Sequence, residues 1–336
     1  MKATQGEEGA LAAFRGARVL ITGGMGFIGS TLAHRLVALG SDVTLLDNMS
    51  AEGGAHPRNI EAIRGKVQIE ARDLRDIDAL KPLLAGQRYL FNLAAQTSHM
   101  GSMAAPLEDL DVNCRAQLAL LELCRAQAPD ITIVFAGTRQ IYGRPDRLPV
   151  DETHPLRPPD VNGVSKMAAE ALHLLYHRTY GLAATSLRLT NTYGPRMRIK
   201  DARQTFVGLW LRRVLEGEPF EVWEGEQRRD LTYVDDAVNA FLLAAAVPAT
   251  QGRAFNIGGG GSLTLLELAR ALVAAHGGGR FEVKSFPPER KRIDIGDYEA
   301  DDRLFRQVTG WQPQVPLAEG LAKSLAYYRE TLRDYR

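Results

Sequence analysis

Three glycines follow an apolar strand near the beginning of the chain and precede a helical pattern. Residues 19–22 read Val-Leu-Ile-Thr, and Gly23, Gly26 and Gly29 come after them. Glycines here let the backbone turn tightly and leave room for a pyrophosphate, because they have no Cβ atom. The free N–H groups and the positive end of the next helix would then face the anion. Such a spacing can also make only a turn, so the flanking sequence decides its meaning.

The sequence after the glycines favours a dinucleotide site. Residues 27–39 carry apolar side chains at helical spacing, and a second apolar strand over 43–46 ends in Asp47. Asp47 lies 18 residues after Gly29, near the position where a carboxylate accepts hydrogen bonds from the adenine ribose. The same carboxylate would repel a 2′-phosphate, so the pattern predicts NAD rather than NADP. The alternative for Asp47 is a solvated residue at a strand end.

Strand-like and helix-like segments alternate through the first half of the chain. Apolar runs predict strands at 17–22, 42–47, 67–71, 88–94, 131–136 and 184–189. Helical spacing predicts helices at 27–39, 57–64, 76–85, 105–127 and 162–180. This alternation is typical of a Rossmann-type α/β fold, a doubly wound parallel sheet with helices on both faces. After about residue 190 the elements shorten, which predicts a smaller substrate-binding lobe.

The order of these elements predicts three parts of the chain. We expect a frayed N-terminal extension over 1–16, an NAD-binding domain over 17–190, and a substrate-binding lobe over 191–336. We also expect pieces of the lobe to return to the main sheet, so that the two units are partly interleaved.

Composition limits the classes of partner. The 336 residues include 41 basic and 40 acidic side chains, a net charge of +1, which argues against a nucleic-acid or membrane-surface protein. No apolar run is long enough to cross a bilayer, and no signal peptide is evident. Cys114 and Cys124 lie ten residues apart on one helical pattern, about 15 Å and too far for a disulfide. We therefore expect free thiols in a cytoplasmic protein.

A series of short motifs along the chain resembles a known family. After the glycine fingerprint, the motifs in chain order are Asp73-Leu74, Asn92-Leu93-Ala94-Ala95, Asn113, Thr138 with Ile141-Tyr142-Gly143, Asn191-Thr192-Tyr193-Gly194-Pro195, Arg229-Asp230, Tyr233-Val234-Asp235-Asp236, Asn256-Ile257-Gly258 and Gly310-Trp311-Gln312-Pro313. Over about residues 17–330 the chain resembles an extended short-chain dehydrogenase/reductase of the NAD-dependent nucleotide-sugar epimerase/dehydratase group. One motif could arise by chance, whereas the ordered series is specific.

The resemblance implies roles for individual positions. It implies cofactor contacts at Gly23, Gly26, Phe27, Ile28, Asp47, Asn48, Asp73, Leu74, Ala94, Ala95, Gln96, Asn113 and Lys166. For a nucleotide-sugar substrate, it implies Asn191 at the diphosphate, with Arg229 and Arg292 neutralising the phosphates. Two guanidinium groups suit a diphosphate, because bidentate contacts match its geometry. The alternative for each arginine is an exposed solubilising side chain.

The chain departs from the family at the Tyr-x-x-x-Lys motif, in which the tyrosine moves the proton. The matching segment is Asn162-Gly163-Val164-Ser165-Lys166, with Asn162 at the tyrosine position. An amide neither gives nor accepts a proton at neutral pH. Lys166 could still hold the nicotinamide ribose. The proton step therefore needs another agent.

Three agents remain open. Thr138 matches the family's catalytic Ser/Thr, but a lone hydroxyl usually only orients the substrate. His99, in a loop after the fourth strand, is of a type that exchanges protons near neutral pH, and a structural histidine is its alternative. A water held by Asn162 and Lys166 is the third. We therefore expect Thr138, His99, Asn162 and Lys166 at the catalytic centre. We expect no metal there, because the histidines lack a metal-binding motif.

The residues after Thr138 favour epimerisation. Arg139 and Gln140 stand where family dehydratases carry an acidic pair and where decarboxylases commonly keep a Glu. We expect NAD-dependent epimerisation of a nucleotide-diphosphate sugar through a transient ketone, with a UDP-sugar and C4 as first choices. The alternatives are a protein that binds NAD and nucleotide sugar without turnover, or a dehydratase or decarboxylase of the same family. The segments 105–127 and 162–180 resemble helices that pair in family dimers, so we expect a homodimer.

Overall fold

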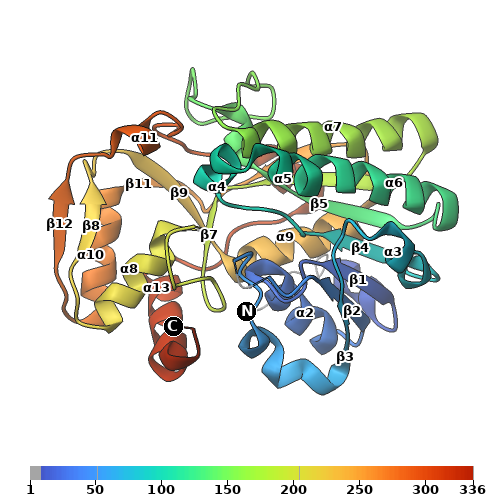
Figure 1. The fold of residues 1–336 in the computed structure, drawn as a ribbon, viewed down its shortest axis with the longest axis horizontal. Coiled ribbons are helices and arrows are strands. Elements are labelled where there is room, and N and C mark those ends of the chain that lie inside the picture. The colour runs from blue at the N-terminus through green and yellow to red at the C-terminus, as the bar shows by residue number, and fades with distance from the viewer. Residues whose placement is uncertain (1–8, 51, 204, 336) are drawn as a thin grey trace.

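The structure, a computed structural model, describes residues 9–50, 52–203 and 205–335. Its centre is a seven-stranded sheet in the order β10-β6-β5-β4-β1-β2-β3, with all neighbours parallel (Figure 1). Its strands are β1 (Arg18–Thr22), β2 (Asp42–Asp47), β3 (Val67–Ala71), β4 (Tyr89–Asn92), β5 (Thr132–Thr138), β6 (Ala184–Leu189) and β10 (Ala254–Ile257). The predicted Rossmann-type fold is confirmed.

Helices cover both faces of this sheet. On one face, α3 (Ile77–Leu84), α6 (Ala116–Gln127) and α7 (Val161–Tyr180) share a core cluster with β1, β4 and β5. On the other face, α2 (Phe27–Ala38) and α9 (Val234–Ala246) belong to a larger cluster that continues into the second lobe. Apolar strands without polar alternation require this cover, because both sides of each strand must be buried.

The second lobe consists of two small sheets and several helices. One sheet holds β7 (Asn191–Tyr193), β9 (Arg228–Tyr233) and β11 (Ser262–Thr264), and the other pairs β8 (Phe220–Trp223) with β12 (Phe281–Lys284). The helices are α8 (Phe206–Leu215), α10 (Leu265–His276), α11 (Pro288–Lys291), α12 (Arg303–Thr309) and α13 (Leu317–Thr331). Because β10 is the edge strand of the main sheet and α9 covers its face, the second half of the chain is interleaved with the first.

The structure differs from the sequence expectation over 99–127. The predicted helix at 105–127 is divided into α5 (Pro106–Leu110), a π-helical turn η3 (Asp111–Arg115) and α6, and another helix, α4 (His99–Ala104), precedes it. Asn113 lies on the π-helical turn, and its side chain bonds the backbone of Gln96. A π-helical turn in an α-helix often marks a functional site.

The first residues of the described chain are also not a frayed extension. Leu11 and Phe14 are buried, and the Phe14 ring centroid lies 4.8 Å from that of Tyr89 in β4. A short helix, η1 (Ala12–Phe14), positions this ring at the base of the sheet. The expectation for residues 1–8 lies outside the described residues.

The remaining short helices are η2 (Pro57–Lys66), η4 (Arg139–Tyr142), η5 (Pro248–Thr250) and η6 (Leu332–Tyr335). The helix expected at 57–64 is therefore present with 3₁₀ geometry. No helix among the described residues has both the length and the apolar character needed to cross a bilayer.

Candidate active site

A cavity of about 1180 Å³ lies at the carboxyl ends of the central strands. The glycine turn after β1, Asp47 after β2 and Thr138 at the end of β5 contribute to one side of its wall, and Phe206 and Trp223 of the second lobe contribute to the other. Open parallel sheets bind ligands at this edge, because the loops that follow the strands diverge there.

The glycine turn has the geometry that an approaching pyrophosphate requires. Gly23 has φ +69°, and a Cβ atom there would lie 2.9 Å from the backbone nitrogen of Ala94. A Cβ atom at Gly29 would lie 2.2 Å from the carbonyl oxygen of Gly23. Gly26 is the N-cap of α2 and has no side chain to satisfy the first N–H groups of that helix. These groups are therefore available to an anion.

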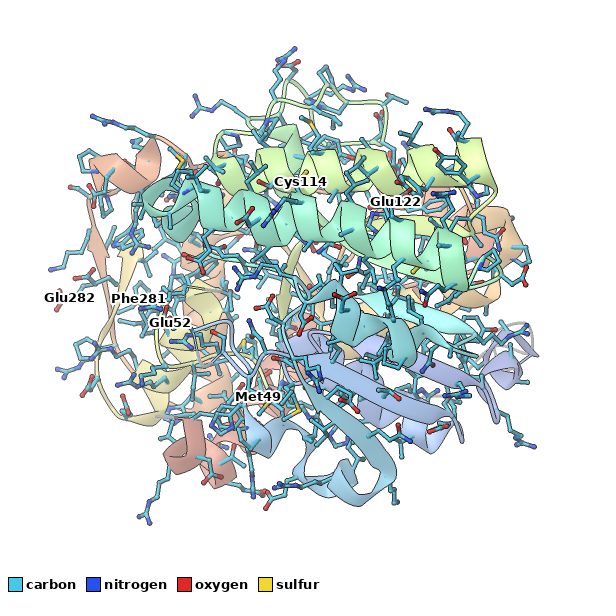
Figure 2. All side chains as sticks on the ribbon, turned by 45° about the vertical axis from the view of Figure 1, so that its right-hand side comes forward. Met49, Glu52, Cys114, Glu122, Phe281 and Glu282 are labelled. Carbon is cyan, nitrogen blue, oxygen red and sulfur yellow. The ribbon has the colours of Figure 1, made fainter. Side chains whose placement is uncertain are left out.

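Asp47 is buried at the end of β2 and lines the cavity. Its Oδ2 accepts a hydrogen bond from the Met25 backbone N–H at 2.9 Å, and its Oδ1 accepts one from Met49 at 2.9 Å. Burial raises the pKa of this carboxyl, and the two hydrogen bonds oppose that rise. Figure 2 shows Met49 on the loop after β2. The carboxylate is thus fixed beside the glycine turn.

Asp73 and Asn113 were also predicted to contact the cofactor, but only Asp73 lines the cavity. Asp73 lines the cavity; an Arg75 hydrogen bond at 2.8 Å, together with one from Asn48, holds the pKa of its carboxyl well below the usual range. Asn113 does not line the cavity. Its amide group instead exchanges hydrogen bonds of 3.1 and 2.9 Å with the backbone of Gln96, so it holds the segment after β4 in position.

Asn162, in the first turn of α7, has both amide hydrogens engaged. Its Nδ2 donates to the carbonyl oxygen of Gln96 at 2.8 Å and to Oδ2 of Asp109 at 3.1 Å. Asp109 is fully buried, and its Oδ1 has no hydrogen-bond partner among the described residues. Only the Oδ1 acceptor of Asn162 remains for a ligand, and this atom cannot donate or take up a proton.

Lys166 lies one turn along α7 and lines the same cavity. Its Nζ donates to the Ala136 carbonyl oxygen at 2.8 Å and lies 4.6 Å from the centroid of the Phe135 ring. Burial lowers the pKa of this ammonium group to about 8, although the charge of Asp109 opposes the shift. At neutral pH the group still carries a positive charge in the cavity wall.

His99 begins α4, whereas the sequence analysis placed it in a loop. Its Nδ1 lies 2.9 Å from Oδ2 of Asp160, the N-cap residue of α7. The same Oδ2 accepts from Nε2 of Gln140 at 2.8 Å, and Oδ1 accepts from the Gly163 N–H at 2.7 Å. Burial alone would raise the pKa of Asp160, but these hydrogen bonds outweigh it and lower the pKa. His99 lines the cavity, as do Thr138 and Asn162.

The residues that follow β5 bring a second cation to the cavity. The Arg139 guanidinium lies 5.8 Å from the Tyr298 ring centroid, and burial and the charge of Arg229 lower its pKa to about 10. Arg229 pairs with Asp294 at 2.6 Å and donates to the Gly296 carbonyl oxygen at 2.6 Å. Arg139 has no such ion pair among the described residues.

The structure brings most of the predicted residues to one cavity. Those that line it are Gly23, Gly26, Phe27, Ile28, Asp47, Asn48, Asp73, Leu74, Ala94, Ala95, Gln96, His99, Thr138, Asn162, Lys166, Asn191 and Arg229. Arg292 is exposed and does not line the cavity; Arg290, whose guanidinium lies 5.0 Å from the Trp223 ring centroid, does. Sequence reasoning missed Asp160, although an Asp directly before the helical pattern at 162–180 is a typical N-cap signal.

The histidine pair on α7 is not a metal site. His173 is buried, its ring centroid lies 4.4 Å from that of Phe135, and burial lowers the pKa of its imidazole to about 4. Nδ1 of His177 lies 3.1 Å from the Leu182 carbonyl oxygen. In the described chain no three His, Cys, Asp or Glu side chains are arranged to hold a metal ion.

Comparisons with known proteins agree with this geometry. Residues 19–258 match the model of the NAD dependent epimerase/dehydratase family. The chain belongs to this family. It is 34% identical over 315 residues to a UDP-glucose 4-epimerase of Mycolicibacterium smegmatis, covering 93% of this chain and 98% of that protein. It is 31% identical over 325 residues to UDP-glucuronic acid decarboxylase 1 of Xenopus tropicalis, covering 94% and 73%.

The solved structures include a UDP-glucose 4-epimerase of Thermotoga maritima with UDP-glucose. It superimposes with a TM-score of 0.85 at 30% identity and covers 94% of this chain and 99% of that one. NAD is the cofactor of the family, and the residues present fit it. The glycine turn could receive the pyrophosphate, Asp47 could receive the ribose hydroxyls, and Lys166 could reach the nicotinamide ribose.

The buried charge of Lys166 predicts a stability cost in the NAD-free protein. We expect Lys166→Met to raise the free energy of unfolding by roughly 1–3 kcal/mol at pH 7, because it removes a desolvated ammonium group. The pKa of about 8 in the folded protein lies below the ordinary lysine value of 10.5. Between pH 8 and 10.5 the unfolded wild-type chain therefore binds more protons than the folded one. The free energy of unfolding of the wild type should accordingly rise with pH in this range and approach that of Lys166→Met.

Urea unfolding of both proteins between pH 6.5 and about 10 measures this difference. Lys81→Met is the control, because Lys81 is half exposed and pairs with Asp78 on the surface of α3. A Lys166→Met protein less stable than the wild type at pH 7 would contradict the prediction.

Proposed function

We propose that the chain catalyses NAD-dependent epimerisation of a UDP-sugar at C4 through a transient ketone. The observation that carries this proposal is the common cavity of Thr138, Asn162 and Lys166 beside the glycine turn. The UDP-glucose 4-epimerases among its relatives support the choice of sugar and carbon. When bound, NAD takes a hydride from the sugar carbon and returns it to the other face.

The protein residues would bind and orient the two ligands. Asp47, held by two backbone N–H groups, would accept hydrogen bonds from the adenine ribose. Lys166 would hold the nicotinamide ribose and keep a positive charge near the sugar hydroxyl. Thr138 would orient that hydroxyl, since its own Oγ1 accepts from the Gln140 N–H at 3.1 Å and its hydrogen remains free to donate.

The nucleotide diphosphate would lie on the side of the second lobe. Asn191 and Arg229 line that part of the cavity, and we keep both as diphosphate contacts. Arg292, the C-cap residue of α11, is exposed, so we assign its predicted role to Arg290, which lies on α11 and lines the cavity. An arginine whose guanidinium stacks on an aromatic ring, as Arg290 does on Trp223, can still donate hydrogen bonds from its edge to a phosphate.

The residues after Thr138 favour epimerisation over the dehydratase and decarboxylase alternatives. Gln140 Nε2 donates to Asp160, so its amide is engaged and has no acidic proton to give. Arg139 is a cation and cannot protonate a leaving hydroxyl. Loss of water across two carbons needs an acid and a base, and neither position provides the acid.

The proposal is tested with a panel of nucleotide sugars that includes UDP-glucose, UDP-galactose and UDP-glucuronate. We expect NMR of the products to show interconversion of C4 epimers without loss of water or carbon dioxide, and none with Lys166→Met. A 6-deoxy-4-keto product or a pentose would indicate a dehydratase or a decarboxylase. Tight binding of NAD and nucleotide sugar with no hydride transfer would indicate the binding protein.

Asp47 predicts the choice between the two dinucleotides. A carboxylate about 4 Å from a 2′-phosphate repels it by roughly 1–4 kcal/mol, and about 1.4 kcal/mol is a factor of ten in affinity. We expect calorimetry to give NAD at least about tenfold tighter binding than NADP, and Asp47→Ser to narrow the difference. Asp42→Ser is the control at the opposite end of β2. Equal affinities in the wild type would refute the role of Asp47.

We also propose a homodimer that pairs α6 and α7. These helices lie side by side on the outside of the molecule in both views, where Figure 2 labels Glu122 of α6 and Cys114 of the preceding turn η3. Exposed apolar side chains on α6 and α7 are Leu118, Val164, Leu175 and Tyr180, and the neighbouring α5 adds Leu107 and Leu110. Light scattering at micromolar concentration should give twice the chain mass, and Leu118→Asp with Leu175→Asp should give a monomer. A monomeric wild type would contradict the proposal.

A further inference from the structure

The unresolved part of the proposed reaction is the group that takes the proton from the sugar hydroxyl. Asn162 cannot serve, because its two amide hydrogens are engaged and its oxygen is not a base. Lys166, with a pKa of about 8, is largely protonated at neutral pH and cannot accept a second proton. Asp109 carries an unpartnered oxygen, but this residue does not line the cavity.

His99 has the arrangement that a proton acceptor needs. Nδ1 of its ring is buried and lies 2.9 Å from Oδ2 of Asp160, the only described carboxylate that pairs with it, although the two atoms are not aligned as a hydrogen bond in this structure. The side chain is nevertheless 37% exposed, so the accessible part of the ring is the edge away from Asp160, which carries Nε2. No described residue hydrogen-bonds to Nε2. A neutral imidazole that donates from Nδ1 to Asp160 presents the lone pair of Nε2 to the cavity.

Asp160 has the properties of a group that holds such a ring. Its side chain is fully buried, and its oxygens are fixed by the Gly163 N–H at 2.7 Å and by Nε2 of Gln140 at 2.8 Å. Burial raises the pKa of this carboxyl, but the contact and charge of His99, together with the bonds from Gly163 and Gln140, outweigh burial and lower the pKa, so the group remains an anion. A buried anion on Nδ1 fixes the tautomer and stabilises the imidazolium that forms on Nε2. Gln140, the second residue after Thr138, helps to position this carboxylate.

The geometry points to His99, positioned by Asp160, as the proton acceptor and donor in place of the family tyrosine. This inference rests on the proposed function. In the oxidation step, the hydroxyl proton would pass to Nε2 of His99 while C4 gives up its hydrogen with the bonding electron pair, as a hydride for which NAD would be the acceptor, and the C4–O bond would become a carbonyl. In the reduction step, the hydride returns to the opposite face of C4, and Nε2 gives its proton back to the oxygen. Asp160 stays ionised throughout.

The competing explanation is that His99 only fastens α4 to α7. Ser102 already does so, because its Oγ accepts from the Asn162 N–H at 3.1 Å and donates to the His99 carbonyl oxygen at 2.7 Å. Ser102→Ala therefore loosens the same segment and leaves the imidazole and its carboxylate in place. It is the matched control for a purely structural role.

The first experiment needs no turnover. NMR of the ¹⁵N-labelled imidazole in the full-length, NAD-loaded protein should find the neutral His99 ring with its proton on Nδ1. Asp160→Asn presents an amide in place of the carboxylate and should move that proton toward Nε2, while the Asn oxygen still caps α7. A wild-type proton on Nε2 would overturn the inference, whatever the outcome of the nucleotide-sugar panel.

The second experiment measures turnover of UDP-glucose by the NAD-loaded enzyme. We expect His99→Ala to lower kcat by about a hundredfold or more with KM nearly unchanged, the usual effect of losing an acid–base group. Added imidazole should restore part of the rate, and Asp160→Asn should lower kcat in the same direction. A His99→Ala rate within about threefold of the wild type would refute the inference.

The outcome for the control also decides between the two explanations. A rate loss shared by His99→Ala and Ser102→Ala and unaffected by imidazole would mean that the pair only anchors α4, and the inference would fall. An inactive wild type would instead count against the proposed function, and the NMR measurement would still decide the state of the His99–Asp160 pair.

Discussion

The buried carboxylate of Asp160 connects the parts of the candidate site. It caps α7, the helix that carries Asn162 and Lys166, and it receives hydrogen bonds or close contacts from two further elements, η4 and α4. A buried anion is stable only when donors surround it. The Asp160 carboxylate therefore links the positions of Gln140, His99 and the first turn of α7, because all three contact it.

The anchoring of α7 on the sheet complements this cap. Glu170, two turns further along α7, pairs with Arg188 of β6 at 2.6 Å, and both side chains are buried. Arg188 also donates to the hydroxyl of Tyr142 at 2.6 Å. Since removal of one partner from a buried pair leaves an uncompensated charge, this network fixes the depth of α7 over the sheet. The cavity end of the helix is consequently rigid enough to position Lys166 against Ala136.

The amide of Asn162 is held by a hydrogen-bond network of its own beside Lys166. A tyrosine at position 162 would bring a phenol near Lys166; the asparagine present instead turns its amide toward Asp109 and Gln96. Asp109 and Asn113 lie on α5 and the adjoining π-helical turn, and they share this hydrogen-bond network. Both amide hydrogens of Asn162 are engaged in this network, whereas Oδ1 of Asp109 and Oε1 of Gln96 are buried without a partner among the described residues.

The sequence by itself determined the sheet, the glycine turn and the ordered motifs, because these depend on local periodicity and on backbone geometry that only glycine allows. The bounds predicted from apolar runs match the structure for β2, β3 and β6, and those of β1, β4 and β5 differ by at most two residues at either end. The segment at 99–115 could not, because its breaks follow from Asn113 and Asp109 bonding to distant backbone and side-chain groups rather than from its own pattern.

Only the tertiary structure decided which polar residues share the cavity. Arg290 and Arg292 are indistinguishable as sequence neighbours, yet one lies over Trp223 and the other is exposed. His173 carries the same chemistry as His99, but burial beside Phe135 removes it from any ligand. The pairing of His99 with Asp160 joins residues 61 positions apart. Such pairings depend on how the helices pack over the sheet, and no local pattern in the sequence records them.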